Sequence, residues 1–386
     1  MESFILFIIC FFAIFMSSSA AKLIGIEQVV TFAYTPLIIF AFFRTLDGHF
    51  IIKKHQRNLL FIGLFAIFFK YLLGQDYIRN ITIMLIIPAI LCFSLNSISK
   101  RSAKGIRLAV ILFFIAECFT SFYEYYYKIN LFEWRMISDE QKMIMNRLMD
   151  DWEFRSSALL GHPLMNALCV CVMMSFFITS NLSNRSKLIL FALGYLSLFC
   201  FNARWAIIVS TFLLIPALIK KINQTSKNRI NRKGWFVFVF LSLIYLSYYL
   251  QTHDLGGRLL YNDLADDSTM TRIEVFSFYK FLNWNDILFG SPSLYEFIHE
   301  KLETGGVENG VIVMILSYGL ILTLFILPAL IFFHYRSLQV YKKADRWLIL
   351  AVFYIIGITN PNLAQPYPWY FWIFSYYAFR YHRKIL

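Results

Sequence analysis

The polar residues that could do chemistry in this chain are concentrated in four short fragments of a largely apolar sequence. The fragments run from Arg155 to Ala167, Phe201 to Ile208, Arg272 to Gly290 and Glu308 to Gly319. They contain arginines, a histidine and a glutamate, side chains that bind phosphate groups or move a proton. The sequence has no Gly-rich phosphate loop, nucleophile motif or metal-ligand spacing, so we expect neither ATP nor a metal ion to be used.

Arg204 and Arg272 are the candidates for binding an anion. Arg204 lies between Ala203 and Trp205, in a tight turn between two apolar stretches. An arginine there either reaches the lipid headgroups or holds a phosphate with its fork of donors. Arg272 follows Thr271 in a Thr-Arg-Ile-Glu capping box, which places it in the first turn of a helix. A cation is mildly unfavourable there, so either a nearby carboxylate or an anionic ligand must offset its charge.

Three further residues stand next to the ends of apolar stretches. Glu308, followed by Asn309, is either stabilised by the dipole of the next helix or acts as a general base toward a hydroxyl. His162 precedes Pro163, which fits the first turn of a helix, and it either hydrogen-bonds a neighbour or contacts a ligand. Arg155 faces the same boundary, where it either pairs with an acidic neighbour or binds substrate.

A membrane-spanning scaffold must position these residues. The chain has 386 residues, is 59% hydrophobic and only 15% charged, which excludes disorder and argues against a soluble globule. A spanning helix needs about 20 mainly apolar residues. The twelve candidate spans are 3–19, 28–43, 58–73, 78–96, 107–122, 157–180, 188–203, 205–219, 235–250, 309–333, 347–359 and 367–380. We therefore predict an all-α polytopic membrane protein with about 12 transmembrane helices.

The basic residues indicate the orientation of these spans. If the N-terminus is cytoplasmic, the inside segments hold 23 of the 36 lysines and arginines and only three acidic residues. The positive-inside rule therefore places both termini in the cytoplasm. The net charge of +13 then reflects orientation, and we expect no nucleic-acid binding. The first apolar stretch resembles a signal peptide but lacks a preceding positive charge, so we expect an uncleaved span.

Two outward segments, 121–156 and 251–308, are too long to be simple turns. Capping boxes predict short helices inside them, beginning at Ser138, Thr271 and Ser293. The domain prediction is a single transmembrane domain over 1–386 with two helical extracytoplasmic loops. All six cysteines fall within predicted spans without metal spacing, and we assign them to packing.

Taken together, the four fragments resemble the O-antigen and capsule polysaccharide polymerase/ligase superfamily. Residues 155–167 end in Gly-His-Pro-Leu-Met-Asn-Ala, similar to that family's span start with histidine or asparagine, proline and asparagine. Residues 201–204 resemble its small-Ser-Arg hairpin, with Ala203 in place of the usual serine. Residues 272–290 resemble its loop element of an arginine, an aromatic residue and Leu-Phe-Gly.

The fourth fragment, 308–320, resembles the family's re-entry element, His-Asn followed by Tyr-Gly. Glu308 stands where ligases of the family tend to carry histidine, and this departure favours a polymerase over a ligase. The resemblance covers roughly residues 155–325 together with the overall topology.

The resemblance implies a metal-independent, cofactor-free glycosyltransferase with a GT-C-like helical membrane fold. It would join undecaprenyl-diphosphate-linked oligosaccharide repeat units into O-antigen, capsule or exopolysaccharide on the outer face of the cytoplasmic (inner) membrane. Its partners would be the lipid-linked donor and acceptor, the lipid bilayer and a chain-length regulator. Arg204 and Arg272 would bind the donor diphosphate, and Glu308 or His162 would orient or deprotonate the acceptor hydroxyl. The expected substrate contacts are Arg155, Asn309, Arg258 and Trp284.

Two other functions fit the same pattern of spans. One is an O-antigen ligase-like transferase, which hands the glycan to a different acceptor. The other is a flippase or transporter of lipid-linked oligosaccharides, which should carry polar residues at several span centres. Glu117 is nearly alone in such a position, while Lys70 and Arg79 lie near the outer boundary. The gathering of polar residues in the outer loops therefore favours an extracytoplasmic enzyme.

Overall fold

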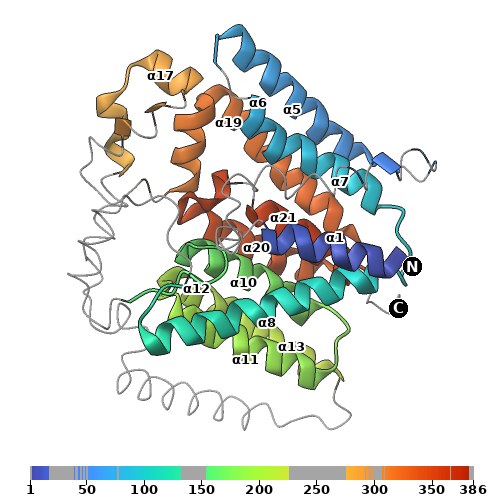
Figure 1. Cartoon of the computed structure of the whole chain (residues 1–386). Helices are drawn as coiled ribbons and strands as arrows, with labels where there is room; N and C mark the ends of the chain where they lie inside the picture. The colour runs from blue at the N-terminus through green and yellow to red at the C-terminus, as the bar shows by residue number, and fades with distance from the viewer. Residues whose placement is uncertain are drawn as a thin grey trace. The chain divides into compact units, whose positions relative to one another are not determined.

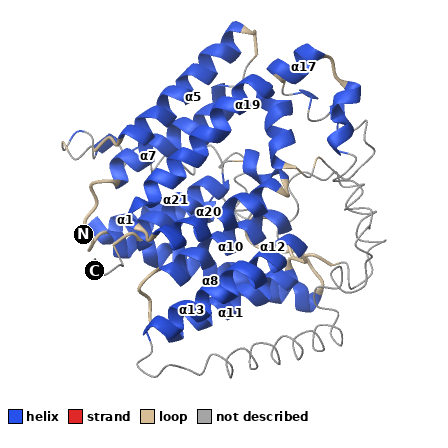
Figure 2. Ribbon diagram, turned by 180° about the vertical axis from the view of Figure 1, so that it is seen from behind, coloured by secondary structure: helices blue, strands red, loops and turns tan. Residues whose placement is uncertain are grey.

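The structure is a computed structural model that describes most of the chain. The described residues are 2–16, 51–75, 78–131, 154–225, 275–291, 307, 309–365 and 367–381, with single positions within 39–48 and 293–298. Over these residues the regular secondary structure is entirely helical, as predicted (Figure 2).

The structure describes the bounds of thirteen α-helices and five π- and 3₁₀-helical turns. The α-helices with described bounds are α1 (Glu2–Met16), α5 (Lys54–Leu72), α6 (Ile78–Ile81), α7 (Ile87–Leu95), α8 (Ala103–Tyr127), α10 (Pro163–Thr179), α11 (Asn184–Cys200), α12 (Arg204–Val209), α13 (Ile215–Thr225), α17 (Trp284–Phe289), α19 (Gly310–Ser337), α20 (Lys343–Ile358) and α21 (Tyr367–Phe379). Two π-helical turns, η1 (Thr82–Ile86) and η3 (Ser210–Leu214), join α6 to α7 and α12 to α13. The 3₁₀ turns are η4 (Val275–Phe281), η5 (Leu338–Val340) and η6 (Pro361–Ala364).

Four helical segments among the described residues are long and apolar enough to cross a membrane. They are Ile78–Leu95, Ala103–Tyr127, Arg204–Gln224 and Gly310–Val340. Helices satisfy their own backbone hydrogen bonds, which the hydrocarbon core requires. By their length and composition, these segments indicate a membrane protein. The number of twelve spans and the GT-C-like arrangement stay predictions.

The predicted spans coincide with helices wherever their residues are described, with shifts at the ends. Span 235–250 lies outside the described residues, and 28–43 does so almost entirely. The prediction of a helix from 157 was wrong at its start, because α10 begins only at Pro163. Proline lacks an N–H and has a φ suited to the first helical turn. Helix α8 continues to Tyr127, beyond the predicted end at 122.

The chain divides into two compact units. The first comprises Met1–Ser17, Gln28–Val110 and Leu264–Tyr381, and the second comprises Ser18–Glu27, Ile111–Asp263 and His382–Leu386. This division into compact units does not test the prediction of a single transmembrane domain, which stays a prediction.

In the first unit, α19 packs against α5, α17, α20 and η6, and α5 packs against α7 (Figure 1). Gly310 allows the start of α19 to approach the end of α20, because a Cβ there would lie 2.7 Å from the Gly357 carbonyl oxygen and 2.8 Å from that of Asn360.

In the second unit, α10 is the central helix, and it packs against α11, α12 and α13 (Figure 1). Every residue of α10 except Leu164 is buried, as expected for a helix that is hydrophobic on all sides. The close approach of α11 depends on Gly194, where a Cβ would lie 2.7 Å from the Met174 sulfur and 2.8 Å from the Phe114 ring.

Candidate functional site

The first two polar fragments lie together in the second unit. The Ser156 N–H donates to the Cys200 carbonyl at 2.9 Å, and Arg155 Nε donates to the Phe201 carbonyl at 3.3 Å. Arg204 is the first residue of α12, directly after the same turn. Two predicted site arginines of this unit, Arg155 and Arg204, therefore flank one backbone turn at the end of α11.

The backbone of both fragments contains unusual conformations. Ala158 and Asn202 have positive φ angles of 35° and 51°, a region that costs an L-residue about 1–2 kcal/mol. Gly161, at φ 68°, adopts the same region without that cost. Strained residues persist only where their surroundings hold them, and they often cluster at functional sites.

Two buried carboxylates hold the strained segment in place. Glu124 Oε2 accepts hydrogen bonds from Ser156 Oγ at 2.6 Å and from the Ala158 N–H at 2.8 Å. Glu117 Oε2 accepts one from the Leu159 N–H at 3.1 Å. Both glutamates are fully buried on α8. They therefore position the segment that leads to His162.

Glu124 was not among the residues selected from the sequence. The sequence feature that could have identified Glu124 is its spacing of seven residues from Glu117, which places both carboxylates on the same face of one helix, two turns apart. Asn166 on α10 completes the anchoring, because its Nδ2 donates to the Ser157 carbonyl. Three buried polar side chains from two helices thus fix residues 156–159.

His162 is the N-cap residue of α10 and has an extended backbone. Burial, together with a smaller effect of the nearby Arg155 guanidinium, lowers the pKa of its imidazole from 6.5 to about 3. An imidazole with so low a pKa is neutral near pH 7 and is a weak base. This low basicity suits the orientation of an acceptor hydroxyl better than its deprotonation.

This pKa predicts an acid-sensitive fold. The folded protein holds His162 neutral, whereas the unfolded chain protonates it near pH 6.5. The contribution of neutral His162 to the free energy of unfolding is therefore full above pH 6.5 and is lost as the pH falls toward 3. We expect the thermal midpoint of His162→Gln, measured in detergent, to fall less between pH 7 and pH 4 than that of the unsubstituted protein. Parallel curves for the two proteins would show that His162 does not make this contribution.

The third and fourth fragments meet in the first unit. Helix α17 ends at Gly290, which has a φ of 61°, and α19 is broken at Gly319, which has a φ of 84°. A Cβ at Gly290 would collide with the Gly319 nitrogen, and one at Gly319 would collide with Leu288 O and the Phe289 backbone. The Ser291 N–H donates to the Leu316 carbonyl at 2.9 Å. The Leu-Phe-Gly and Tyr-Gly elements therefore form a junction between two backbones.

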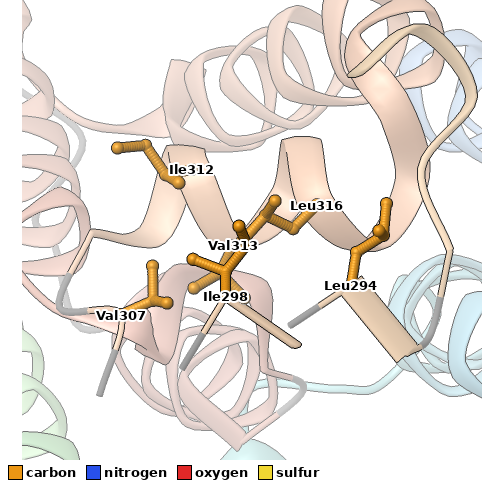
Figure 3. Packing of buried hydrophobic residues seen from close by; sticks show 6 residues of the cluster. All are labelled: Leu294, Ile298, Val307, Ile312, Val313 and Leu316. Atoms are coloured by element: carbon orange, nitrogen blue, oxygen red, sulfur yellow. The ribbon is translucent and has the colours of Figure 1, made fainter. Parts of the chain in front are cut away.

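An apolar cluster extends this junction along the first half of α19. Leu294, Ile298 and Val307 of the second predicted loop pack on α19 residues (Figure 3). Their partners on the helix are Ile312, Val313 and Leu316. The described positions 293–294 and 297–298 are helical, as the capping box at Ser293 predicted. This part of the second loop is therefore folded against α19.

Two of the predicted substrate contacts belong to this unit. Asn309 is the N-cap of α19, and its Oδ1 accepts from the N–H groups of Val311 at 3.0 Å and Ile312 at 3.2 Å. This cap gives Asn309 a structural role beside the predicted one. Trp284 begins α17 and is 75% exposed, so its ring is accessible to a ligand.

The remaining predicted site residues cannot be placed. Arg272, Glu308 and Arg258 lie outside the described residues, as do the capping boxes at Ser138 and Thr271. Their roles stay predictions, including the convergence of Arg204 and Arg272. Among the described residues no group of three or more His, Cys, Asp or Glu side chains is placed to hold a metal ion. All six cysteines are buried and free, consistent with packing.

Comparison of the chain with protein-family models, with curated proteins and with solved structures found no match in any of the three.

Proposed function

We propose that the protein is a polysaccharide polymerase that joins lipid-diphosphate-linked oligosaccharides on the outer face of the cytoplasmic membrane. The observation that carries the proposal is the pairing of the four polar fragments. The first contacts the second in one unit, and the third contacts the fourth in the other. Each pairing joins polar fragments that are far apart in the sequence, and this supports the proposal.

The arginines would bind the diphosphate of the donor. A guanidinium presents a planar fork of donors that matches phosphate oxygens. Arg204 stands in the first turn of a helix, where the helix dipole adds to its attraction for an anion. Arg155 lies beside the same turn. In the proposed site Arg272 joins them from the second loop.

The reaction itself would be a glycosyl transfer. A hydroxyl oxygen of the acceptor attacks the anomeric carbon of the donor sugar, and the bond from that carbon to the diphosphate oxygen breaks. The hydroxyl proton passes to a base, for which Glu308 is the candidate, while neutral His162 orients the hydroxyl. Stabilisation of the departing diphosphate by the arginines would be the largest contribution to the rate.

The second unit offers a specific argument against a transporter. Glu117, the acidic residue that the sequence places at a span centre, accepts a hydrogen bond from a backbone N–H. Glu124, the other buried carboxylate of α8, holds the same segment. Their role in fixing residues 156–159 gives both carboxylates a structural explanation.

The test is polymerisation in a purified system. Protein reconstituted in lipid nanodiscs and supplied with undecaprenyl-diphosphate-linked repeat units should produce a ladder of longer glycans, with no nucleotide or metal added. Transfer of the glycan only to a lipid A-core acceptor would identify a ligase instead. Movement of the intact lipid-linked unit across a vesicle bilayer, without any ladder, would identify a flippase.

A further inference from the structure

A lysine is almost completely buried at the junction of α5, α17 and α19. Lys70, in the last turn of α5, has a relative exposure of 1%. A buried charge is costly unless hydrogen bonds replace its water shell. The sequence places Lys70 near the outer boundary, so its surroundings in the first unit have to explain its burial.

Among the residues that the structure describes, four oxygen atoms lie within hydrogen-bond distance of the Lys70 ammonium. Nζ donates to the Phe289 carbonyl at 2.5 Å and to the carbonyls of Gly290 and Ser317 at 3.3 Å. It also donates to Gln75 Oε1 at 2.7 Å, and Gln75 Nε2 in turn donates to the Gly290 carbonyl at 2.8 Å. The lysine therefore contacts one side chain of its own segment and the main chains of two other helices.

The three carbonyls are those that a helix end leaves without an intrahelical partner. Phe289 and Gly290 end α17, and Ser317 lies in the turn of α19 that precedes the break at Gly319. The last carbonyls of a helix carry partial negative charge, which a cation stabilises. The ammonium thus neutralises two helix ends at once, while the Ser291 N–H bonds the neighbouring Leu316 carbonyl.

We propose that the Lys70 ammonium is the built-in cation of a four-oxygen site that positions α17 and the first half of α19. Because α17 carries Trp284 and α19 begins after Asn309, Lys70 also sets the placement of two proposed substrate contacts; this consequence rests on the proposed function. Lys70 is a positioning residue and touches no reacting atom.

The site suits a compact ammonium. Its oxygens converge on one atom, whereas a guanidinium spreads its donors over a plane. An apolar side chain of the same length would remove the ammonium donor from the Phe289 and Ser317 carbonyls, and the loss of a charged donor from buried carbonyls is costly.

Chemical rescue tests the site. In Lys70→Ala the side chain that is removed corresponds to n-propylammonium, which should occupy the four-oxygen site when added to the protein in detergent. The readout is hydrogen exchange of the Ser291 amide, whose bond to Leu316 O holds the junction. Loss of a charged hydrogen-bond donor should accelerate this exchange by about 10- to 100-fold, and n-propylammonium should restore slow exchange. The neutral analogue 1-propanol should not.

Two further variants keep the test decisive. Lys70→Met retains the hydrocarbon chain without the charge, and it replaces the alanine variant if that variant fails to fold. Its Ser291 amide should exchange as fast as in Lys70→Ala. Added n-propylammonium should not slow this exchange. Lys54→Met, on the exposed side of the same helix, should exchange like the unsubstituted protein. Wild-type exchange in Lys70→Met, or equal rescue by 1-propanol, would overturn the proposal. The hydrogen-exchange measurement needs no glycan substrate. Failure of the protein to polymerise glycans would therefore contradict only the proposed function.

Discussion

Replacing Arg204 by alanine is expected to lower the rate of glycan polymerisation by about 10²–10³-fold, the usual effect of removing one preorganised donor from a site that stabilises developing charge. Arg204 directly follows the turn whose Phe201 carbonyl accepts a hydrogen bond from Arg155. The two buried glutamates of α8 fix the adjacent segment 156–159. The measurement is the initial rate of ladder formation in nanodiscs at equal protein concentration.

The matched control is Arg185→Ala. Arg185 is an exposed arginine near the start of α11, and it lies on the side predicted to be cytoplasmic. Its loss should leave the rate unchanged. Arg272→Ala should resemble Arg204→Ala, because both arginines are proposed to bind the same diphosphate. Unsubstituted rates in both Arg204→Ala and Arg272→Ala would rule out the site.

Substitution of Gly290 or Gly319 by alanine should have the largest effect on stability. Each glycine has a positive φ, and a Cβ on either would collide with the backbone around the other. The left-handed conformation costs about 1–2 kcal/mol for an alanine, and forced overpacking costs about 1–3 kcal/mol more. Their sum is a large part of a typical stability of about 5–15 kcal/mol. We expect little folded protein, measured as the monodisperse fraction after detergent extraction.

Gly74 provides the control for this effect. It has a φ of 69°, close to that of Gly290, but a Cβ there would meet nothing within 4 Å. Gly74→Ala therefore isolates the cost of the left-handed backbone, and it should fold with a modestly lower thermal midpoint. If Gly290→Ala were as stable as Gly74→Ala, close contact between the two backbones would not be the reason for the glycine.

The sequence predicted the helical class and the approximate position of the spans because long apolar runs determine both. It also identified the four fragments, but the structural reasons for some of their residues emerged only from tertiary contacts. Gly290 and Gly319 were selected as parts of two motifs, whereas the structure shows that they pack against each other. That pairing depends on the folding of α17 onto α19, which no local pattern reveals.

Two buried charged residues show a second limit of prediction from the sequence. Lys70 and Glu124 bind main-chain groups of segments distant in sequence. Main-chain partners leave no trace in the sequence of side chains, so Lys70 was placed only near the outer boundary and Glu124 was not selected. The start of α10 was misplaced for a similar reason, because residues 157–162 are apolar enough to extend a span while their backbone is turned by Ala158 and Gly161.

The central claim is that Arg204 and Arg272 converge beyond the lipid on one diphosphate. The most direct measurement is an electron cryomicroscopy structure of the protein bound to an undecaprenyl-diphosphate-linked repeat unit. We predict both guanidinium groups at about 2.7–2.9 Å from oxygens of the same diphosphate. Guanidinium groups tens of ångströms apart, or on opposite sides of the membrane, would contradict the proposed mechanism.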